Sequence, residues 1–203
     1  MQATPPRSLP YTGDPEADAL LAAEPMALLI GFVLDQQVSV QKAFSGPLEL
    51  KRRVGTLDAA TIAALDPADL EAAFRERPAL HRFPGNMAKR TQALCSAVAQ
   101  DYGDEAARIW TEAQDGPDLE RRLLALPGIG DMKAKSMLAI LGRRYGVRLD
   151  GLDTVMPTYP TLADVDSAET LAHYQEQKRA YKAKLRAEGG SFDAKAAGGS
   201  GKG

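Results

Sequence analysis

The apolar residues of this chain recur at helical spacing, and no stretch alternates apolar and polar residues as a strand does. Residues 26–34 are apolar on all sides, a pattern typical of a helix buried inside a bundle. Asp14-Pro15 and Asp66-Pro67 each place a capping carboxylate before a proline at the first helical position, which predicts two helix starts. The pattern therefore predicts an all-α protein.

Further helices are expected along the rest of the chain, over residues 38–54, 67–74, 87–102, 105–114, 118–142 and 166–185. We expect the first of these to break at Gly46-Pro47, because proline lacks the N–H that a helix interior needs. Residues 118–142 are read as two helices joined by a tight turn, and Asp166 with Glu169 approximates a capping box. Residues 1–13 are an extended lead-in, 14–187 one helical domain, and 188–203 a disordered tail rich in Gly, Ser, Ala and Lys.

Composition narrows the possible functions of the 203 residues. The single cysteine, Cys95, excludes a disulfide framework and a four-cysteine iron–sulfur cluster, and neither His81 nor His173 has metal-ligand spacing. No apolar run is long enough for a signal peptide or for the about 20 residues that span a bilayer. The formal net charge of −2 means that a nucleic-acid surface would have to be a local patch. We therefore expect a cytoplasmic protein without a membrane partner.

The segment Leu126-Pro-Gly-Ile-Gly130 is the most informative motif. Gly128 and Gly130 allow a sharp turn and bring unpaired N–H groups to the surface at the start of the next helix, where they suit a phosphate oxygen. Lys133 adds positive charge nearby. An ordinary αα-hairpin uses Gly and Pro for the same backbone reasons, so spacing alone leaves both interpretations open.

This hairpin, followed about twenty residues later by Leu149-Asp-Gly151, resembles the helix–hairpin–helix–Gly/Pro–Asp (HhH-GPD) family of base-excision DNA glycosylases, and the MutY-type adenine glycosylases within it. Gln36-Gln-Val-Ser-Val40 is similar to the alkylpurine glycosylases of the family. Phe83-Pro-Gly-Asn-Met-Ala-Lys-Arg90 resembles the loop and helix with which other members wedge the duplex. The resemblance covers residues 25–151. Within the family, the chain resembles a small bacterial branch whose members lack an iron–sulfur cluster.

The resemblance implies a two-lobed all-α fold and a glycosylase of base-excision repair that flips a damaged or mispaired base out of double-stranded DNA. It implies that Asp150 stabilises the cationic sugar or activates water, with Asp153 in Leu152-Asp153-Thr154 as the alternative acid. It also implies a set of DNA-binding residues, comprising Gln36, Gln37 (the residue that fills the gap in the duplex), Phe83 (the wedge), Gly128, Gly130 and Lys133.

One departure from the family bears on chemistry. Bifunctional members carry a lyase lysine two residues after the second hairpin glycine, where this chain has Met132. Lys133 follows directly, but one helical position rotates a side chain by about 100°. We therefore expect monofunctional hydrolysis of the N-glycosidic bond, which leaves an abasic site. No organic cofactor or metal is expected, apart from a monovalent cation that the family binds at the hairpin, residues 126–130. We also expect the protein to be a monomer that is located at the nucleoid.

Two interpretations from other classes stay open. A non-catalytic helix–hairpin–helix DNA-binding protein would keep the hairpin without hydrolysis, and Met132 together with the short C-terminal part supports it. A helical protein–protein adaptor would bind no phosphate at all. The last predicted helix carries a basic run that is either a solvated face or a phosphate-binding one, namely Lys178, Arg179, Lys182, Lys184 and Arg186.

Overall fold

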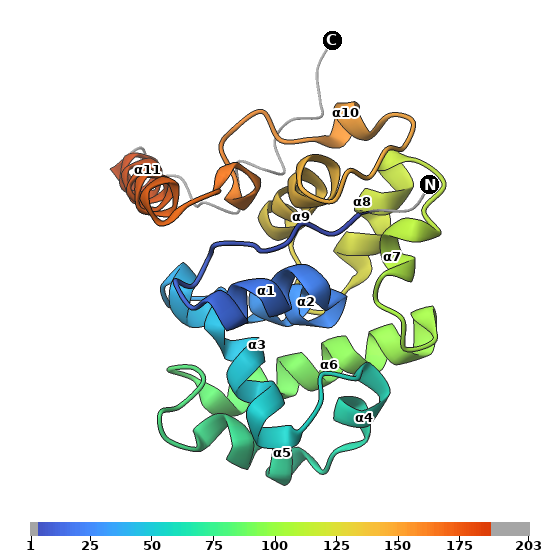
Figure 1. Ribbon diagram of the computed structural model, residues 1–203, viewed down its shortest axis with the longest axis vertical. Coiled ribbons are helices and arrows are strands. Elements are labelled where there is room, and N and C mark those ends of the chain that lie inside the picture. The colour runs from blue at the N-terminus through green and yellow to red at the C-terminus, as the bar shows by residue number, and fades with distance from the viewer. Residues whose placement is uncertain (1–3, 188–203) are drawn as a thin grey trace.

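A computed structural model describes residues 4–187, and this part of the chain contains eleven α-helices, one 3-10 helix and no strand (Figure 1). The prediction of an all-α protein is confirmed. The elements are α1 (Pro15–Ala23), α2 (Pro25–Leu34), α3 (Val40–Val54), α4 (Ala59–Ala64), α5 (Pro67–Arg75), α6 (Pro84–Tyr102), α7 (Arg108–Thr111), α8 (Gly116–Ala125), α9 (Asp131–Arg143), α10 (Leu152–Val155), η1 (Leu162–Asp164) and α11 (Ala168–Ala187).

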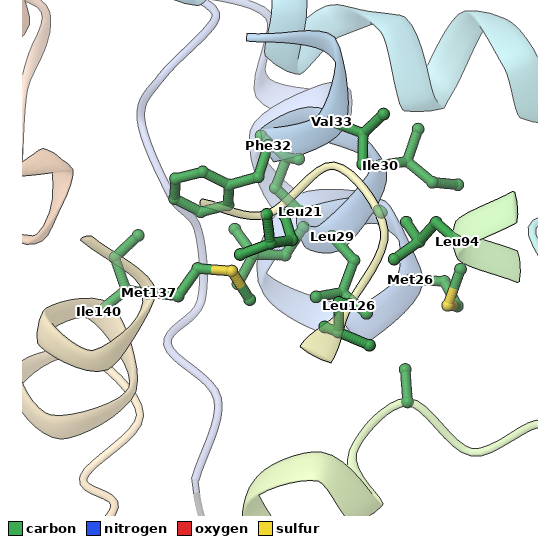
Figure 2. Close-up of a cluster of buried hydrophobic side chains, with 14 of the residues drawn as sticks. Leu21, Met26, Leu29, Ile30, Phe32, Val33, Leu94, Leu126, Met137 and Ile140 are labelled. Atoms are coloured by element: carbon green, nitrogen blue, oxygen red, sulfur yellow. The ribbon is translucent and has the colours of Figure 1, made fainter. Parts of the chain in front are cut away.

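The helices form two groups on either side of α1 and α2, with α3–α6 in one group and α8–α11 in the other (Figure 1). Helix α2 is buried along almost its whole length and contributes side chains to both groups. Figure 2 shows Phe32 of α2 on the side of Met137 of α9, Leu29 beside Leu126 of the hairpin turn, and Leu94 of α6 on the opposite side of α2. Burial of each such side chain stabilises the fold by about 1.5–3 kcal/mol. The apolar run of residues 26–34 is thus the shared core helix, as predicted.

The local capping signals explain where several helices begin. Asp14 accepts a hydrogen bond from the N–H of Glu16, and Asp66 accepts one from the N–H of Ala68, so both predicted caps are confirmed. The sequence pattern does not predict helix α4, although Asp58 caps it by accepting from the N–H of Thr61 at 2.7 Å. Helix α11 begins one residue after Ser167, whose hydroxyl accepts from the N–H of Thr170.

The predicted break at Gly46-Pro47 is wrong, because α3 runs without interruption from Val40 to Val54. A Cβ at Gly46 would collide with the side chain of Leu34, and one at Gly31 would lie 2.5 Å from the ring of Phe44, so the two glycines let α2 and α3 approach closely. An interior proline costs a helix about 3 kcal/mol. Burial of the apolar face of α3 offsets this cost, which the sequence pattern could not show.

Two other boundaries differ from expectation. The helix predicted over residues 105–114 is reduced to the single turn Arg108–Thr111. The N-terminal segment is not a separate lead-in, because Leu9 and Tyr11 are fully buried and the Tyr11 hydroxyl donates to the carbonyl of Leu162. The predicted tail, residues 188–203, lies outside the described residues. Within residues 4–187, no single helix is long and apolar enough to cross a membrane, and only the pair α1–α2, bent by 113°, meets that test of length and composition.

Candidate functional site

The hairpin turn between α8 and α9 is open to solvent. Gly128 has a φ of +83°, a conformation that favours glycine, and both Gly128 and Gly130 are exposed. Buried Ile129 anchors the turn between them. A Cβ at Gly130 would have no heavy atom within 4 Å. The first N–H groups of a helix have no partner inside it, so the start of α9 presents free donors at an uncrowded surface.

The turn packs against the C-terminal end of α2. A Cβ at Gly128 would lie 3.3 Å from Cγ2 of Val33, one residue before the end of that helix. Lys133 extends back over the turn, and its Nζ donates to the carbonyl oxygen of Gly128 at 3.1 Å. The predicted phosphate-binding turn therefore lies beside the polar segment that follows α2.

Four charged side chains lie around the end of α2. Asp35 follows α2, and its Oδ2 lies 3.4 Å from Nζ of Lys178 on α11, with side chains 14% and 27% exposed respectively. Lys133 of α9 lies within electrostatic range of both groups and of Arg90 on α6. We call these four residues the Asp35 cluster. Lys178 is the member of the predicted basic run that reaches it, while the side chains of Lys182, Lys184 and Arg186 lie outside the described part of the chain.

Burial and charge shift the titration of two lysines in this cluster. Burial lowers the pKa of Lys133 to about 8, with the Asp35 carboxylate opposing the shift and the neighbouring cations reinforcing it. Burial also lowers the pKa of Lys178, but the attraction of Asp35 and Tyr174 outweighs it and the net shift is upward. Lys178 is therefore held protonated against Asp35, whereas Lys133 is the easier of the two to deprotonate.

The two glutamines after Asp35 have different environments. Gln36 is half-buried, and its side chain is engaged by the protein: its Nε2 donates to the carbonyl of Val33 and its Oε1 accepts from Arg90 Nη1 at 2.7 Å. Gln37 is exposed, with a φ of +57° that is uncommon for a residue other than glycine. Of the two predicted DNA-binding glutamines, Gln37 is the more exposed, and the Gln36 side chain is bound to Val33 and Arg90.

The side chain of His81 connects the loop before α6 to the segment that contains Gln36 and Gln37. The His81 ring is 2% exposed, its Nδ1 accepts from the N–H of Phe83 at 3.1 Å, and its Nε2 lies 2.9 Å from the carbonyl oxygen of Gln36. Only the neutral ring protonated on Nε2 satisfies both partners. Burial lowers the His81 pKa and favours this neutral form. Sequence reasoning misses this role, and its only local signal is the position of His81 two residues before Phe83.

Phe83, the predicted wedge, is the most exposed large apolar side chain of this loop, at 42%. The guanidinium of Arg82 lies 4.8 Å from the centre of its ring. Lys42 of α3 donates to the carbonyl of Ala79 in the same loop. A single exposed aromatic ring is not by itself evidence of a binding surface, so the role of Phe83 as a wedge stays a prediction.

The two acids predicted to be catalytic lie elsewhere. The carbonyl of Asp150 accepts from the N–H of Gly116, so Asp150 lies at the start of α8, whereas the hairpin turn follows its end. The ten residues of α8 separate these two points by about 15 Å. Asp153 lies on α10, and both acids are exposed. The structure does not bring either acid to the Asp35 cluster, and their assignment stays a prediction.

A cavity of about 500 Å³ opens beside the cluster. Residues 157–160 form one wall, and His173, Tyr174 and Gln177 of α11 form the other. The Tyr174 ring also contacts Lys178, whose Nζ lies 5.7 Å from its centre. The sulfur of Met132 lies 3.4 Å from the Tyr159 hydroxyl, so Met132 and Lys133 point in different directions, as helical geometry requires. No three His, Cys, Asp or Glu side chains of residues 4–187 are grouped to hold a metal ion.

An all-α fold with an exposed glycine turn between two antiparallel helices defines a helix–hairpin–helix protein. The family model described as HhH-GPD superfamily base excision DNA repair protein matches residues 30–145, more than half of the chain. The chain belongs to this superfamily. The matched residues include the end of α2, the Phe83 loop and the hairpin but neither Asp150 nor Asp153. No curated protein and no solved structure shows a significant match to the chain.

Proposed function

We propose that the protein is a monofunctional DNA glycosylase that hydrolyses the N-glycosidic bond of a damaged or mispaired base in double-stranded DNA. One observation carries the proposal: the open hairpin turn packs directly against the end of α2, next to the exposed Gln37. A group that can hold a phosphate and a group that can enter the duplex are thus adjacent. Membership of a base-excision repair superfamily supports the same activity.

In this function the hairpin fixes the protein on the DNA backbone. The N–H groups at the start of α9 and the ammonium of Lys133 bind one phosphate, which positions the protein without reading sequence. Gln37 fills the space that the extruded nucleotide leaves, and Phe83 enters from the neighbouring loop. His81 connects the two loops and holds them next to each other.

The monofunctional character rests on Met132. Its thioether has no nitrogen to form a Schiff base with the abasic sugar. Lys133 directs its ammonium to the carbonyl of Gly128. A monovalent cation of the kind that the family resemblance implies would have to share this carbonyl with the ammonium.

The test is excision from a panel of duplexes that carry uracil, an alkylated purine, an oxidised pyrimidine, 8-oxoguanine or an adenine mispair. We expect at least one to yield abasic sites that break only after alkali, with no covalent complex trapped by borohydride. Strand nicking at neutral pH together with a trapped complex that Lys133→Ala abolishes would overturn the monofunctional assignment.

The position of Asp150 favours a second candidate function. Because the acid that the motif indicates lies about 15 Å from the turn, a helix–hairpin–helix protein that binds DNA without catalysis is also compatible with the fold. Salt-sensitive DNA binding without abasic sites on any duplex of the panel would establish this candidate. Absence of DNA binding would instead indicate a protein–protein adaptor.

A further inference from the structure

We propose that Lys178 of α11 and Arg90 of α6 form a second phosphate-binding site for the DNA backbone, beside the phosphate that the hairpin holds. This inference rests on the proposed function, because it extends the surface that binds DNA. Lys178 lies outside the residues that match the family model, and Arg90 lies inside them. The site therefore combines a helix of the matched segment with a helix that follows it.

The position of the two cations is the first argument. Nζ of Lys178 lies 3.4 Å from Oδ2 of Asp35. Nη1 of Arg90 donates to Oε1 of the next residue, Gln36, at 2.7 Å. Both cations lie within electrostatic range of the Lys133 ammonium, which contacts a carbonyl oxygen of the hairpin turn. The two consecutive residues after α2 thus hold one cation each, on the side of the molecule where the hairpin lies.

A DNA strand that is held at the hairpin also passes this position. Gly128 of the hairpin turn lies against Val33 of α2, and Asp35 follows Val33 by two residues, which span at most about 7 Å. A DNA strand carries one phosphate for about every 3.4 Å of helix axis. A phosphate that follows the one at the hairpin is therefore within reach of the long side chains of Lys178 and Arg90.

The charge balance of the Asp35 cluster is the second argument. Lys135, two residues after Lys133 on α9, pairs with Glu120 at 2.6 Å. Lys133 and Arg90, by contrast, form no ion pair with any described side chain, and each donates to a neutral oxygen. The single carboxylate of the cluster is already paired with its third cation. An excess of ammonium and guanidinium groups favours an anion, and phosphate is one that both groups bind through charge-assisted hydrogen bonds.

In the free protein, the Asp35 carboxylate occupies the place of a phosphate beside Lys178. Its side chain is 14% exposed and follows the buried helix α2, so it holds the ammonium in position before DNA binds. A DNA phosphate then competes with this carboxylate for the same ammonium. Asp35 therefore positions Lys178 and at the same time opposes the binding of DNA.

The alternative is a purely structural ion pair. The pair of Asp35 and Lys178, together with the contact of Gln175 to Gln41, holds α11 against the end of α2 and the start of α3. If this were the only role, loss of either partner would affect DNA binding in the same direction, because each loss leaves one charge without its counterpart. A phosphate site predicts opposite effects of the two losses on the affinity for DNA.

The experiment measures the Kd of full-length variants for an undamaged DNA duplex at several salt concentrations. Lys178→Gln and Arg90→Gln should each weaken binding about 10-fold and reduce the slope of log K against log salt by about 0.9, the value of one phosphate contact. The matched control is Arg179→Gln, which removes the same charge from an exposed neighbour on α11 and should keep the wild-type slope. Asp35→Asn should tighten binding about 3-fold, because the phosphate loses its competitor. The slope is independent of the folded fraction, which changes the Kd by the same factor at each salt concentration.

A double variant distinguishes two phosphates from one. If Lys178 and the hairpin hold separate phosphates, the losses of affinity in Lys178→Gln and Gly130→Ala should multiply to within about 2-fold when the changes are combined. A combined loss well below that product would indicate one shared phosphate.

Four results would overturn the second site and leave the proposed function in place. They are a shared phosphate, an unchanged slope in Lys178→Gln or Arg90→Gln, an equal change of slope in Arg179→Gln, and unchanged or weaker binding by Asp35→Asn. A wild-type protein that neither binds the duplex nor excises a base from the lesion panel would overturn the proposed function as well.

Discussion

The two hairpin glycines allow the phosphate-binding role of the turn to be separated from its folding. We predict that Gly130→Ala weakens DNA binding with only a small loss of stability, and that Gly128→Ala, the matched control two residues away, destabilises the protein more strongly. Gly130 has an ordinary φ of −99° and open space where a Cβ would lie. Gly128 has a φ of +83°, and a Cβ on it would lie 3.3 Å from the side chain of Val33.

The magnitudes follow from these environments. Alanine at Gly130 should cost no more than about 1 kcal/mol, because Gly130 is the N-cap residue of α9 and alanine is a poorer N-cap than glycine. Alanine at Gly128 should cost about 1–2 kcal/mol for the left-handed backbone. A methyl group at Gly130 keeps a phosphate oxygen from the adjacent N–H groups, and loss of a hydrogen bond to a charged group costs about 1.5–3 kcal/mol. The Kd for DNA should then rise by about 10- to 100-fold.

The assay is fluorescence anisotropy with two duplexes of unrelated sequence, together with urea denaturation of each variant. Because phosphates carry no sequence information, the Kd should rise by the same factor on both duplexes. Unchanged affinity of folded Gly130→Ala, or a loss confined to one duplex, would refute the phosphate interpretation. The turn would then be an ordinary αα-hairpin.

Three further predictions concern the neighbouring loops and the core. Because the His81 pKa is lower in the folded protein than its ordinary value of about 6.5, unfolding should become easier as the pH falls below about 6.5. Urea denaturation at pH 7.5 and 5.5 should show a smaller pH effect in His81→Asn than in the wild-type protein. An equal effect in both proteins would contradict a His81 ring that is held in its neutral form. Phe83→Ala should reduce excision from a lesion duplex while stability changes by no more than about 0.5 kcal/mol, and unimpaired excision would exclude the wedge. Gly31→Ala should destabilise the protein by about 1–3 kcal/mol through collision with Phe44, and an unchanged urea midpoint would contradict the close approach of α2 and α3.

Most of the fold could be predicted because its signals are local. The caps at Asp14 and Asp66 and the apolar run of α2 are each contained within a few residues. The continuous helix through Pro47 could not be predicted, because the contacts that stabilise it come from another helix. The helix predicted over residues 105–114 is only one turn long, and no side chain caps its start, although Ile109 and Trp110 are buried.

The candidate site also has some parts that could be predicted from the sequence and others that could not. The hairpin could be predicted because turn glycines act on their own backbone. The contact of His81 with the carbonyl of Gln36 joins residues 45 positions apart, and the contact of Lys178 with Asp35 joins residues 143 apart. No local pattern encodes such pairs. The sequence did contain one relevant signal, which is the abrupt change from apolar to polar residues at Asp35.

That abrupt change has a physical consequence for the site. A helix as apolar as α2 is buried up to its last residue, so the first polar residue after it lies at the edge of the core. A carboxylate held there loses much of its hydration and needs compensation from neighbouring cations. One ammonium would be sufficient for neutrality, yet Lys178, Lys133 and Arg90 all converge on this point. The two cations in excess create a local positive field in a chain whose net charge is −2, and an anion such as a DNA phosphate is the partner that such a field attracts.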